Sequence, residues 1–457
     1  MQSRLSAKFA EKQGFPGFCK KPEIESVYFG VTFEAGVLLC PKMTTEQAYF
    51  LAANHPCTDP LGVLYRKDGR ILRAIYPERT AYVRELFESG VIKSLLEHQF
   101  LGPQWLVDQE GINYQCVVES EPAPFQVPPG MYTATSLYRA AELWIELSLA
   151  LNAHGLHLSD AHYGNFQMWD ASIPKWVDLG SIQPRPEPPQ NLQAILQNVA
   201  NELFAPLQLL QQCPQKEHLV RWVVEHASSS GPMHAEGMEP FSPAELIKAE
   251  GIQPWQPPHN APWERALNEA MQFLKALEPS TGVNARSIVG LSPEHSAWIE
   301  KWLEENSADS IIAMGAPNGF LANGALMPVT KMCVVEPEKA RLETAFKQAS
   351  TIEPGRHHIC ALGHPINRSF FKIQLKGDWV LAFDALERWD HHSPIWWENL
   401  LISLHAMAQT GLILAWHPSM EQIPPNELTA RLELLYGQVE VSPLARGGMV
   451  IVASQRR

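Results

Sequence analysis

After Pro279, segments patterned as strands alternate with segments patterned as helices, and this alternation limits the fold more than any other feature of the chain. The strand-like segments are SIIAM (310–314), KMCVVE (331–336), GDWVLAFDAL (377–386) and LILAWHP (412–418), and helix-like segments lie at 296–306, 337–350 and 396–411. Strands separated by helices are typical of a doubly wound parallel sheet. We therefore expect an α/β doubly wound, Rossmann-like domain over residues 281–457.

A candidate cofactor site follows from the ends of these strands. In doubly wound sheets, nucleotide ligands bind at the carboxyl ends of the first strands, where a glycine turn approaches the ligand and an acid accepts ribose hydroxyls. Here the turn GAPNG (315–319) follows the first strand. The sequence predicts a cofactor site from this turn and two acids near strand ends: Gly315, Asn318, Gly319, Glu336 and Asp384. An ordinary strand-to-helix turn without a ligand is the alternative interpretation of GAPNG.

Two acidic loops mark the N-terminal half. Asp160 and Asn165 lie in SDAHYGN, and Asp178 lies in VDLGS after an apolar segment. Phosphoryl transfer needs a carboxylate that orients the acceptor hydroxyl, and oxygen ligands for Mg²⁺. A D-x-x-x-x-N segment followed by an Asp just before a Gly is typical of kinase-like folds. We predict Asp160 as the catalytic carboxylate and Asn165 and Asp178 as metal ligands. Two local Asx turns are the alternative interpretation.

The nucleotide side of such a site is predicted on the preceding strands. Asp68-Gly69, flanked by alternating residues, is a strong hairpin signal. Arg73 lies in its second strand, where kinases carry a phosphate-binding Lys, and Glu85 or Glu88 of the next helix is expected to pair with it. The chain has no G-x-G-x-x-G loop there, and an Arg presents a planar fork where a Lys presents a compact ammonium.

The remaining N-terminal patterns indicate an α+β arrangement. We expect a short helix over 45–55, a helix over 80–100 broken near Gly90, a strand over 112–121 and a long helix over 136–155. Two strand–loop–strand segments, 157–169 and 174–182, carry the acidic loops, and helices follow to about 278. The predicted boundaries are an extension (1–58), a kinase-like domain (59–280, a small β lobe to about 125 and then a helical lobe) and the domain at 281–457.

Composition excludes some partners. The net charge of −13 argues against a nucleic-acid backbone, which needs clustered Lys and Arg. The chain contains no run of about 18 apolar residues, which a membrane span would need. Its first residues lack the apolar core of a signal peptide. The seven cysteines are scattered without a CxxC pair, as expected of reduced, buried thiols. We predict a cytoplasmic protein, and the sequence does not specify its oligomeric state.

Together these segments resemble one family, the bacterial methyltransferase-like proteins related to a rhizobial nodulation protein. The resemblance lies in DPLGVLYRKDGRILRAIYP (59–77), YVRELFESGVIKSLL (82–96), PFQVPPGMY (124–132), GLHLSDAHYGNFQ (155–167) with WVDLGSI (176–182), and NELFAPLQLL (201–210). It is looser over 240–420. The family combines a kinase-like half with a class I methyltransferase domain, and an Arg at the position of Arg73 is part of its pattern.

The resemblance implies a methyltransferase that uses S-adenosylmethionine on a small-molecule or glycan acceptor, which the kinase-like half binds or prepares. Ala313 departs from the usual first motif, which has an acid two residues before its first Gly. Two alternatives stay open. One is a Mg-ATP-dependent phosphotransferase coupled to methylation, which would make a methyl phosphate cap. The other is a binding scaffold without catalysis.

Overall fold

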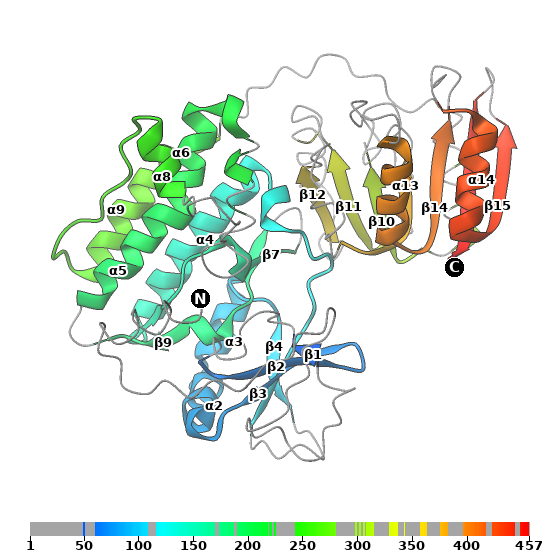
Figure 1. Ribbon diagram of the computed structural model, residues 1–457. Coiled ribbons are helices and arrows are strands. Elements are labelled where there is room, and N and C mark those ends of the chain that lie inside the picture. Colours follow the sequence, from blue (N-terminus) through cyan, green and yellow to red (C-terminus); the bar gives the residue numbers. More distant parts are fainter. Residues whose placement is uncertain are drawn as a thin grey trace, which may run out of the picture.

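The computed structural model describes residues 49–50, 60–107, 116–169, 173–186, 190–217, 219–221, 224, 243–279, 298, 301–302, 305–306, 308–314, 329–336, 342, 357–362, 375–382, 396–416, 423–443 and 448–456. These residues form a five-stranded sheet with a group of helices in the N-terminal half, and a seven-stranded sheet in the C-terminal half (Figure 1). The described parts of the chain contain no helix with the length and apolar character needed to cross a bilayer.

The N-terminal sheet is antiparallel and has the order β1-β2-β3-β5-β4. Its strands are β1 (Tyr49–Phe50), β2 (Gly62–Lys67), β3 (Arg70–Ile75), β4 (Gln104–Val107) and β5 (Val117–Ser120). The predicted hairpin is confirmed: Asp68 and Gly69 both have positive φ, at 50° and 77°, as a two-residue hairpin turn of this type requires. The helix predicted over 45–55 is wrong at Tyr49 and Phe50, because pairing with the edge of β2 satisfies their backbone.

Two short helices cover one face of this sheet. They are α2 (Thr80–Glu88) and α3 (Val91–Glu97), and the predicted break between them is confirmed at Gly90, whose φ is 82°. Val83 and Ile92 are buried in the core that these helices share with the sheet.

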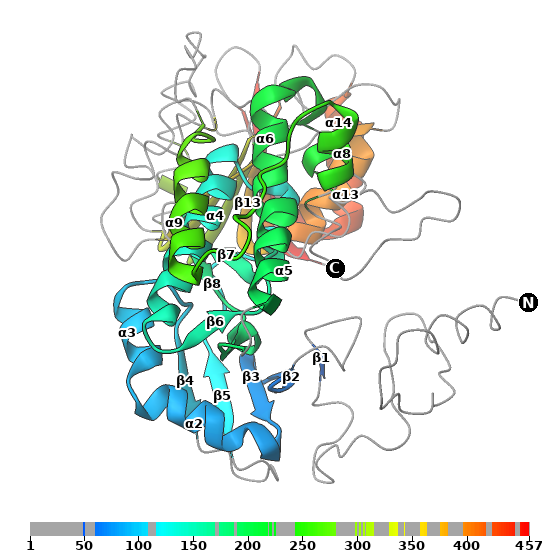
Figure 2. The ribbon, with the colours of Figure 1, turned by 90° about the vertical axis from the view of Figure 1, so that its left-hand side faces the viewer.

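The helical part is built around α4 (Ala134–Asn152), which packs against α9 (Trp263–Lys275) and α6 (Ala205–Gln212) (Figure 2). The hydroxyl of Thr133 caps α4 by accepting the Ser136 N–H at 2.9 Å. A π-helix, η5 (Val199–Phe204), joins α6 to α5 (Gln190–Asn198), and α8 (Pro243–Ala249) lies beside α6.

Two short antiparallel pairs follow α4 and bring the acidic loops together. β6 (Leu156–Leu158) pairs with β9 (Ile182–Pro184), and β7 (Phe166–Met168) pairs with β8 (Pro174–Trp176). The loop from β6 to β7 carries Asp160, and the loop from β8 to β9 carries Asp178. Because the two pairs nest within each other along the chain, both loops lie at the same end.

The C-terminal sheet has the order β12-β11-β10-β13-β14-β16-β15. Its strands are β10 (Ser310–Met314), β11 (Lys331–Glu336), β12 (His357–Leu362), β13 (Gly377–Ala382), β14 (Ala408–Trp416), β15 (Tyr436–Pro443) and β16 (Met449–Arg456). The expectation of a purely parallel sheet needs correction. β16 runs antiparallel to β14 and β15, because it returns directly from β15 without a crossover helix.

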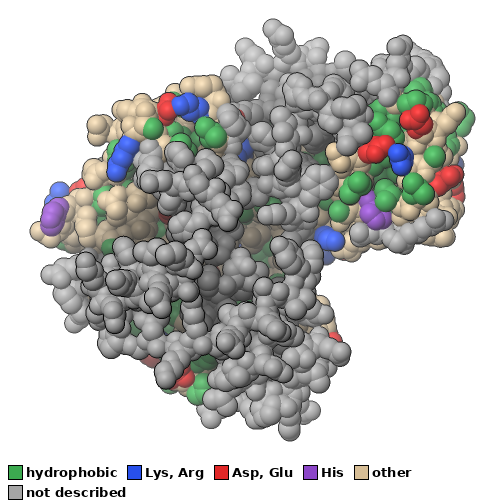
Figure 3. Space-filling view, in the orientation of Figure 1, with side chains coloured by type: hydrophobic (Ala, Val, Ile, Leu, Met, Phe, Trp, Pro, Cys, Tyr) green, Lys and Arg blue, Asp and Glu red, His purple; other side chains and the backbone are tan. Residues whose placement is uncertain are grey.

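Both faces of this sheet are buried, as parallel strands require. Ile312 and Val335 face the core formed with α13 (Trp396–Met407) and α14 (Pro425–Leu435), whereas Ile311 and Val334 face the opposite core. The outer surface of α13 and α14 shows hydrophobic side chains among a few charges, and Ile402 and Leu434 are exposed (Figure 3).

Candidate functional site

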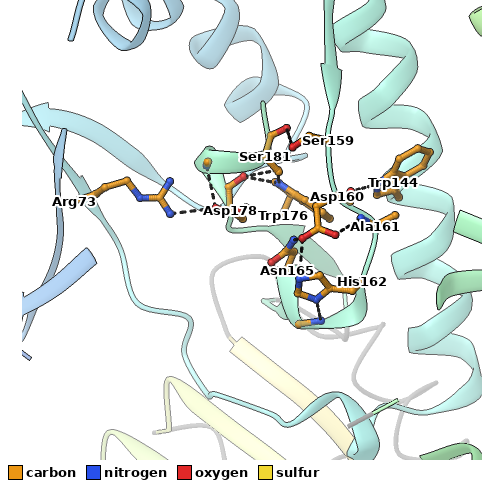
Figure 4. Close-up of polar contacts among 12 residues, drawn as sticks. Arg73, Trp144, Ser159, Asp160, Ala161, His162, Asn165, Trp176, Asp178 and Ser181 are labelled. Atoms are coloured by element: carbon orange, nitrogen blue, oxygen red, sulfur yellow. Dashed lines mark hydrogen bonds and ion pairs between the residues drawn. The ribbon is translucent and has the colours of Figure 1, made fainter. Parts of the chain in front are cut away.

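The N-terminal site brings together four of the predicted side chains, three from two loops and one from the small sheet. Asp160 and Asn165 come from the loop between β6 and β7, Asp178 from the loop between β8 and β9, and Arg73 from β3 (Figure 4). The spacing in the sequence therefore predicted side chains that converge in space. The Asx turn that is the alternative interpretation is present at Asp178, whose Oδ1 accepts the Gly180 N–H, and Arg73 bonds to the same oxygen.

Asp160 is held by three donors. Its Oδ1 accepts the Ala161 N–H at 2.7 Å, and its Oδ2 lies 3.2 Å from Asn165 Nδ2 and 3.0 Å from His162 Nε2. Burial alone would raise the pKa of Asp160, but the bonds from His162, Ala161 and Asn165 hold the pKa below its ordinary value. Its side chain is still 45% exposed. A carboxylate that is ionised, oriented and open to solvent suits an orienter of an acceptor better than a strong base.

Asp178 is paired with Arg73. The Arg73 Nη2 atom lies 3.1 Å from Asp178 Oδ1, which also accepts the Gly180 N–H at 2.9 Å. Arg73 is buried, and the Asp178 side chain is 27% exposed. A buried guanidinium needs such a partner, because an unpaired charge inside a protein is costly.

Glu85 does not join this site. Arg73 points from β3 toward Asp178, whereas Glu85 and Glu88 lie on the exposed side of α2, whose buried side is formed by Val83 and Leu86. Among the described residues no ion pair links either glutamate to Arg73. The expected pairing of Arg73 with Glu85 or Glu88 is therefore wrong. The helical period turns these two acids to solvent, and Arg73 pairs with the carboxylate of Asp178 instead.

His162 lies in the same loop as Asp160 and bonds to its carboxylate. Its Nδ1 accepts the Gly164 N–H at 3.1 Å, so this arrangement holds a neutral imidazole with its proton on Nε2, facing Asp160. Burial alone would lower the pKa of His162, but the hydrogen bond and charge of Asp160 hold the pKa above its ordinary value. The Gly164 bond thus favours the neutral ring, whereas the carboxylate of Asp160 favours the protonated one.

Glu202 is an acid of this region that the sequence motifs did not reveal. It lies in the π-helix η5, and such helices are frequent at functional sites. Burial, with the charge of Asp160, raises the pKa of Glu202, although His162 opposes the shift. The Tyr163 hydroxyl donates to the Leu203 carbonyl at 2.7 Å and so ties the Asp160 loop to η5. Glu202 lies in the resembling stretch NELFAPLQLL, which was its only signal.

The side-chain oxygens of Asp160, Asn165 and Asp178 are the groups at this site that could bind a cation. Asn165 turns its amide N–H toward Asp160, which leaves its carbonyl oxygen as the atom it offers to an ion. The described residues contain no group of three or more His, Cys, Asp or Glu able to hold a metal. Mg²⁺ commonly uses one or two carboxylates plus substrate phosphates, so a dedicated cage is not required.

The C-terminal candidate site is described at one residue. Glu336 ends β11 with its side chain fully buried, at the carboxyl edge beside the end of β10. Gly315, Asn318, Gly319 and Asp384 lie outside the described residues. Gly315 directly follows β10, and Asp384 lies two positions beyond β13, so both belong to chain that leaves the same edge.

Comparison with known proteins gives structural neighbours but no family. No family model matches the chain, and no curated protein sequence matches it. The N-methyltransferase NodS from Bradyrhizobium japonicum WM9 is 10% identical, with a TM-score of 0.30, over 36% of this chain and 96% of that chain. TrmK from M. capricolum, solved with S-adenosyl-homocysteine, is 12% identical, with a TM-score of 0.27, over 37% of this chain and 70% of that chain. At these values the neighbours do not define an activity for this chain.

The sheet itself shows the class of fold. In chain order its strands lie 3-2-1-4-5-7-6, with only the seventh antiparallel. A Rossmann sheet has the order 3-2-1-4-5-6, and this sheet has one further, antiparallel strand between the fifth and the sixth. The C-terminal part of the chain therefore has a doubly wound, Rossmann-like fold.

Proposed function

We propose that this protein is an S-adenosylmethionine-dependent methyltransferase acting on a small-molecule or glycan acceptor. The observation that carries the proposal is Glu336, a fully buried carboxylate at the end of the second strand of a Rossmann-like sheet. An acid at this position accepts hydrogen bonds from ribose hydroxyls. S-Adenosylmethionine supplies an electrophilic methyl group when bound.

The buried position of Glu336 supports a ligand role in this sheet. A carboxylate is costly to bury, and proteins keep such groups where hydrogen-bond donors meet them. Gly315, Asn318 and Gly319 would bring backbone to the same edge, and Asp384 would face the cofactor from the fourth strand. Ala313 supplies no acid at the end of the first strand, so Glu336 would carry more of the affinity.

Calorimetric titration of the full chain with S-adenosylhomocysteine tests this proposal. We expect Glu336→Gln to weaken binding roughly 10- to 100-fold, because hydrogen bonds to a charged group contribute about 1.5–3 kcal/mol. Glu427→Gln, at the start of α14, is the matched control and should bind as the wild type does. No binding by the wild-type chain, or equal binding by Glu336→Gln, would contradict the proposal.

A second candidate function rests on the N-terminal site. We propose that residues 59–280 form a kinase-like domain that binds Mg-ATP, with Asn165 and Asp178 as cation ligands, Arg73 toward the phosphates and Asp160 toward an acceptor hydroxyl. The convergence of these four side chains favours it. If both halves are active, phosphorylation followed by methylation would leave a methyl phosphate. If neither ligand binds, the protein is a scaffold.

A further inference from the structure

We propose that Trp176 is a positioning residue for Asp178, whose backbone it holds beside Arg73 for cation and phosphate binding. The inference rests on the nucleotide site proposed above. Trp176 is fully buried at the end of β8, two residues before Asp178. Its indole touches neither the carboxylate nor Arg73, so any effect it has on the ligand passes through the backbone of Asp178.

The indole N–H fixes the main chain of Asp178. Trp176 Nε1 donates to the Asp178 carbonyl at 2.7 Å, and the Ser181 hydroxyl donates to the same oxygen at 2.8 Å. Both donors are buried, so these bonds face little competition from water. The ring of Trp176 meets Phe166 edge to face, with centroids 4.9 Å apart, which fixes the direction of its N–H. The carbonyl and the carboxylate of Asp178 are thus each held by two donors.

The backbone of Trp176 is bound to the small sheet. Its N–H donates to the Phe100 carbonyl at 2.9 Å, its carbonyl accepts the Gly102 N–H at 2.9 Å, and the two segments form a parallel bridge at Leu101. Residues 100–102 lead directly into β4, a strand of the sheet that carries Arg73 on β3. The backbone of Trp176 therefore bonds that sheet to the segment that leads into the Asp178 loop.

A further link reaches the other acidic loop. The Ser181 carbonyl accepts the Ser159 N–H at 2.8 Å and the Ser159 hydroxyl at 3.1 Å, and Ser159 directly precedes Asp160. Trp144 holds the Asp160 carbonyl in a similar way, through its indole N–H at 2.8 Å. The Asp178 loop is thus bonded to the Asp160 loop through Ser181. It is joined to the sheet of Arg73 both by the Arg73–Asp178 ion pair and through Trp176.

The test is the affinity of the full chain for Mn²⁺ with ATP, measured by electron paramagnetic resonance of free Mn²⁺. Trp176→Phe keeps the buried ring and removes the N–H donor. We expect it to weaken Mn²⁺ binding roughly tenfold, as is usual when a residue that supports a metal ligand is changed. Ser181→Ala removes the second donor to the same carbonyl and should also weaken binding. If Trp176→Phe does not fold, Ser181→Ala provides the test.

Trp263→Phe is the matched control. Trp263 is a buried tryptophan that packs against Trp144, and its indole N–H has no hydrogen-bond partner among the residues that the structure describes. Its substitution shrinks the ring as Trp176→Phe does, but breaks no hydrogen bond to a described residue, and should leave Mn²⁺ affinity unchanged. In an Asp178→Ala background, Trp176→Phe should cause no further loss of affinity, because the ligand it positions is gone.

The outcomes separate the two proposals. Failure of the wild-type chain to bind Mn²⁺ with ATP would overturn the nucleotide site and this inference with it. Binding by the wild type, with equal affinity in the folded Trp176→Phe and Ser181→Ala variants, would overturn the inference alone. A loss in Trp263→Phe as large as in Trp176→Phe would also overturn it, since general loosening of the core would then explain both.

Discussion

At the scale of single residues, Glu202 is a carboxylate in partly buried surroundings with no hydrogen bond or ion pair to a described residue. Burial raises its pKa. Between the ordinary pKa of a glutamate, about 4.3, and this raised pKa, the native state binds more protons than the unfolded state does. Stability therefore falls as pH rises through that window.

We expect Glu202→Gln to be more stable than the wild type at pH 7, because the amide never carries the charge that burial disfavours. The advantage should shrink as pH falls toward 4, where the wild-type carboxyl is protonated in both states. Thermal unfolding of the two proteins at a series of pH values measures this difference. A variant that is less stable at pH 7, or an advantage that does not change with pH, would contradict the assignment.

The same residues show how far sequence reasoning reached at this scale. Asp160, Asn165 and Asp178 were found because their chemistry lies in two short local segments, and the structure brings them together. Glu202 and Trp176 were not found. Glu202 lies on a separate helix, and the proposed role of Trp176 depends on a hydrogen bond of its indole N–H, which no spacing in the sequence predicts. The pairing of Arg73 with Asp178 in place of Glu85 depends on which face of α2 is buried.

At the scale of elements, β14 has a glycine that its neighbours require. A Cβ at Gly411 would press into the indole ring of Trp379 and lie 2.6 Å from the Ala453 carbonyl oxygen. Trp379 has little room to move, because Trp302 packs against it edge to face with centroids 4.4 Å apart.

We expect Gly411→Ala to lower the free energy of unfolding by about 2–3 kcal/mol, the cost of an overpacked core. Gly437→Ala, on β15, is the control. Its Cβ would come no closer than 3.2 Å to Gln455, and we expect a change of less than about 1 kcal/mol. Chemical denaturation of both variants provides the comparison. Equal stability of the two variants would contradict the packing described for β14.

Local sequence patterns predicted the elements whose structure is set by turn residues and apolar runs. The hairpin at Asp68-Gly69, the break at Gly90 and the strands β10, β11, β13 and β14 were all predictable, because turn chemistry and apolar runs mark them. β1 was mistaken for a helix, since its pairing partner decides its structure. β12 begins with His357-His358, which hides its apolar run, and the antiparallel direction of β16 is set by the sheet and not by its own residues.

At the scale of the whole molecule, the chain carries two candidate ligand sites, one in the loop between β8 and β9 and one at the end of β11. One is centred on Asp178 and the other on Glu336, and no described residue belongs to both. The account therefore predicts that each ligand depends on its own carboxylate. The Glu336 site, which carries the proposed methyltransferase function, is the central claim, and the Asp178 site is the second.

Ligand-induced thermal stabilisation of the full chain tests this claim most directly, with S-adenosylhomocysteine and Mg-ATP added separately to the wild type, Glu336→Gln and Asp178→Ala. A ligand at 100 times its Kd stabilises the native state by about 2.7 kcal/mol. We expect S-adenosylhomocysteine to stabilise the wild type and Asp178→Ala, but to have a much smaller effect on Glu336→Gln, and Mg-ATP to show the reverse dependence. A wild-type protein that S-adenosylhomocysteine does not stabilise, or Glu336→Gln stabilised as strongly as the wild type, would contradict the central claim.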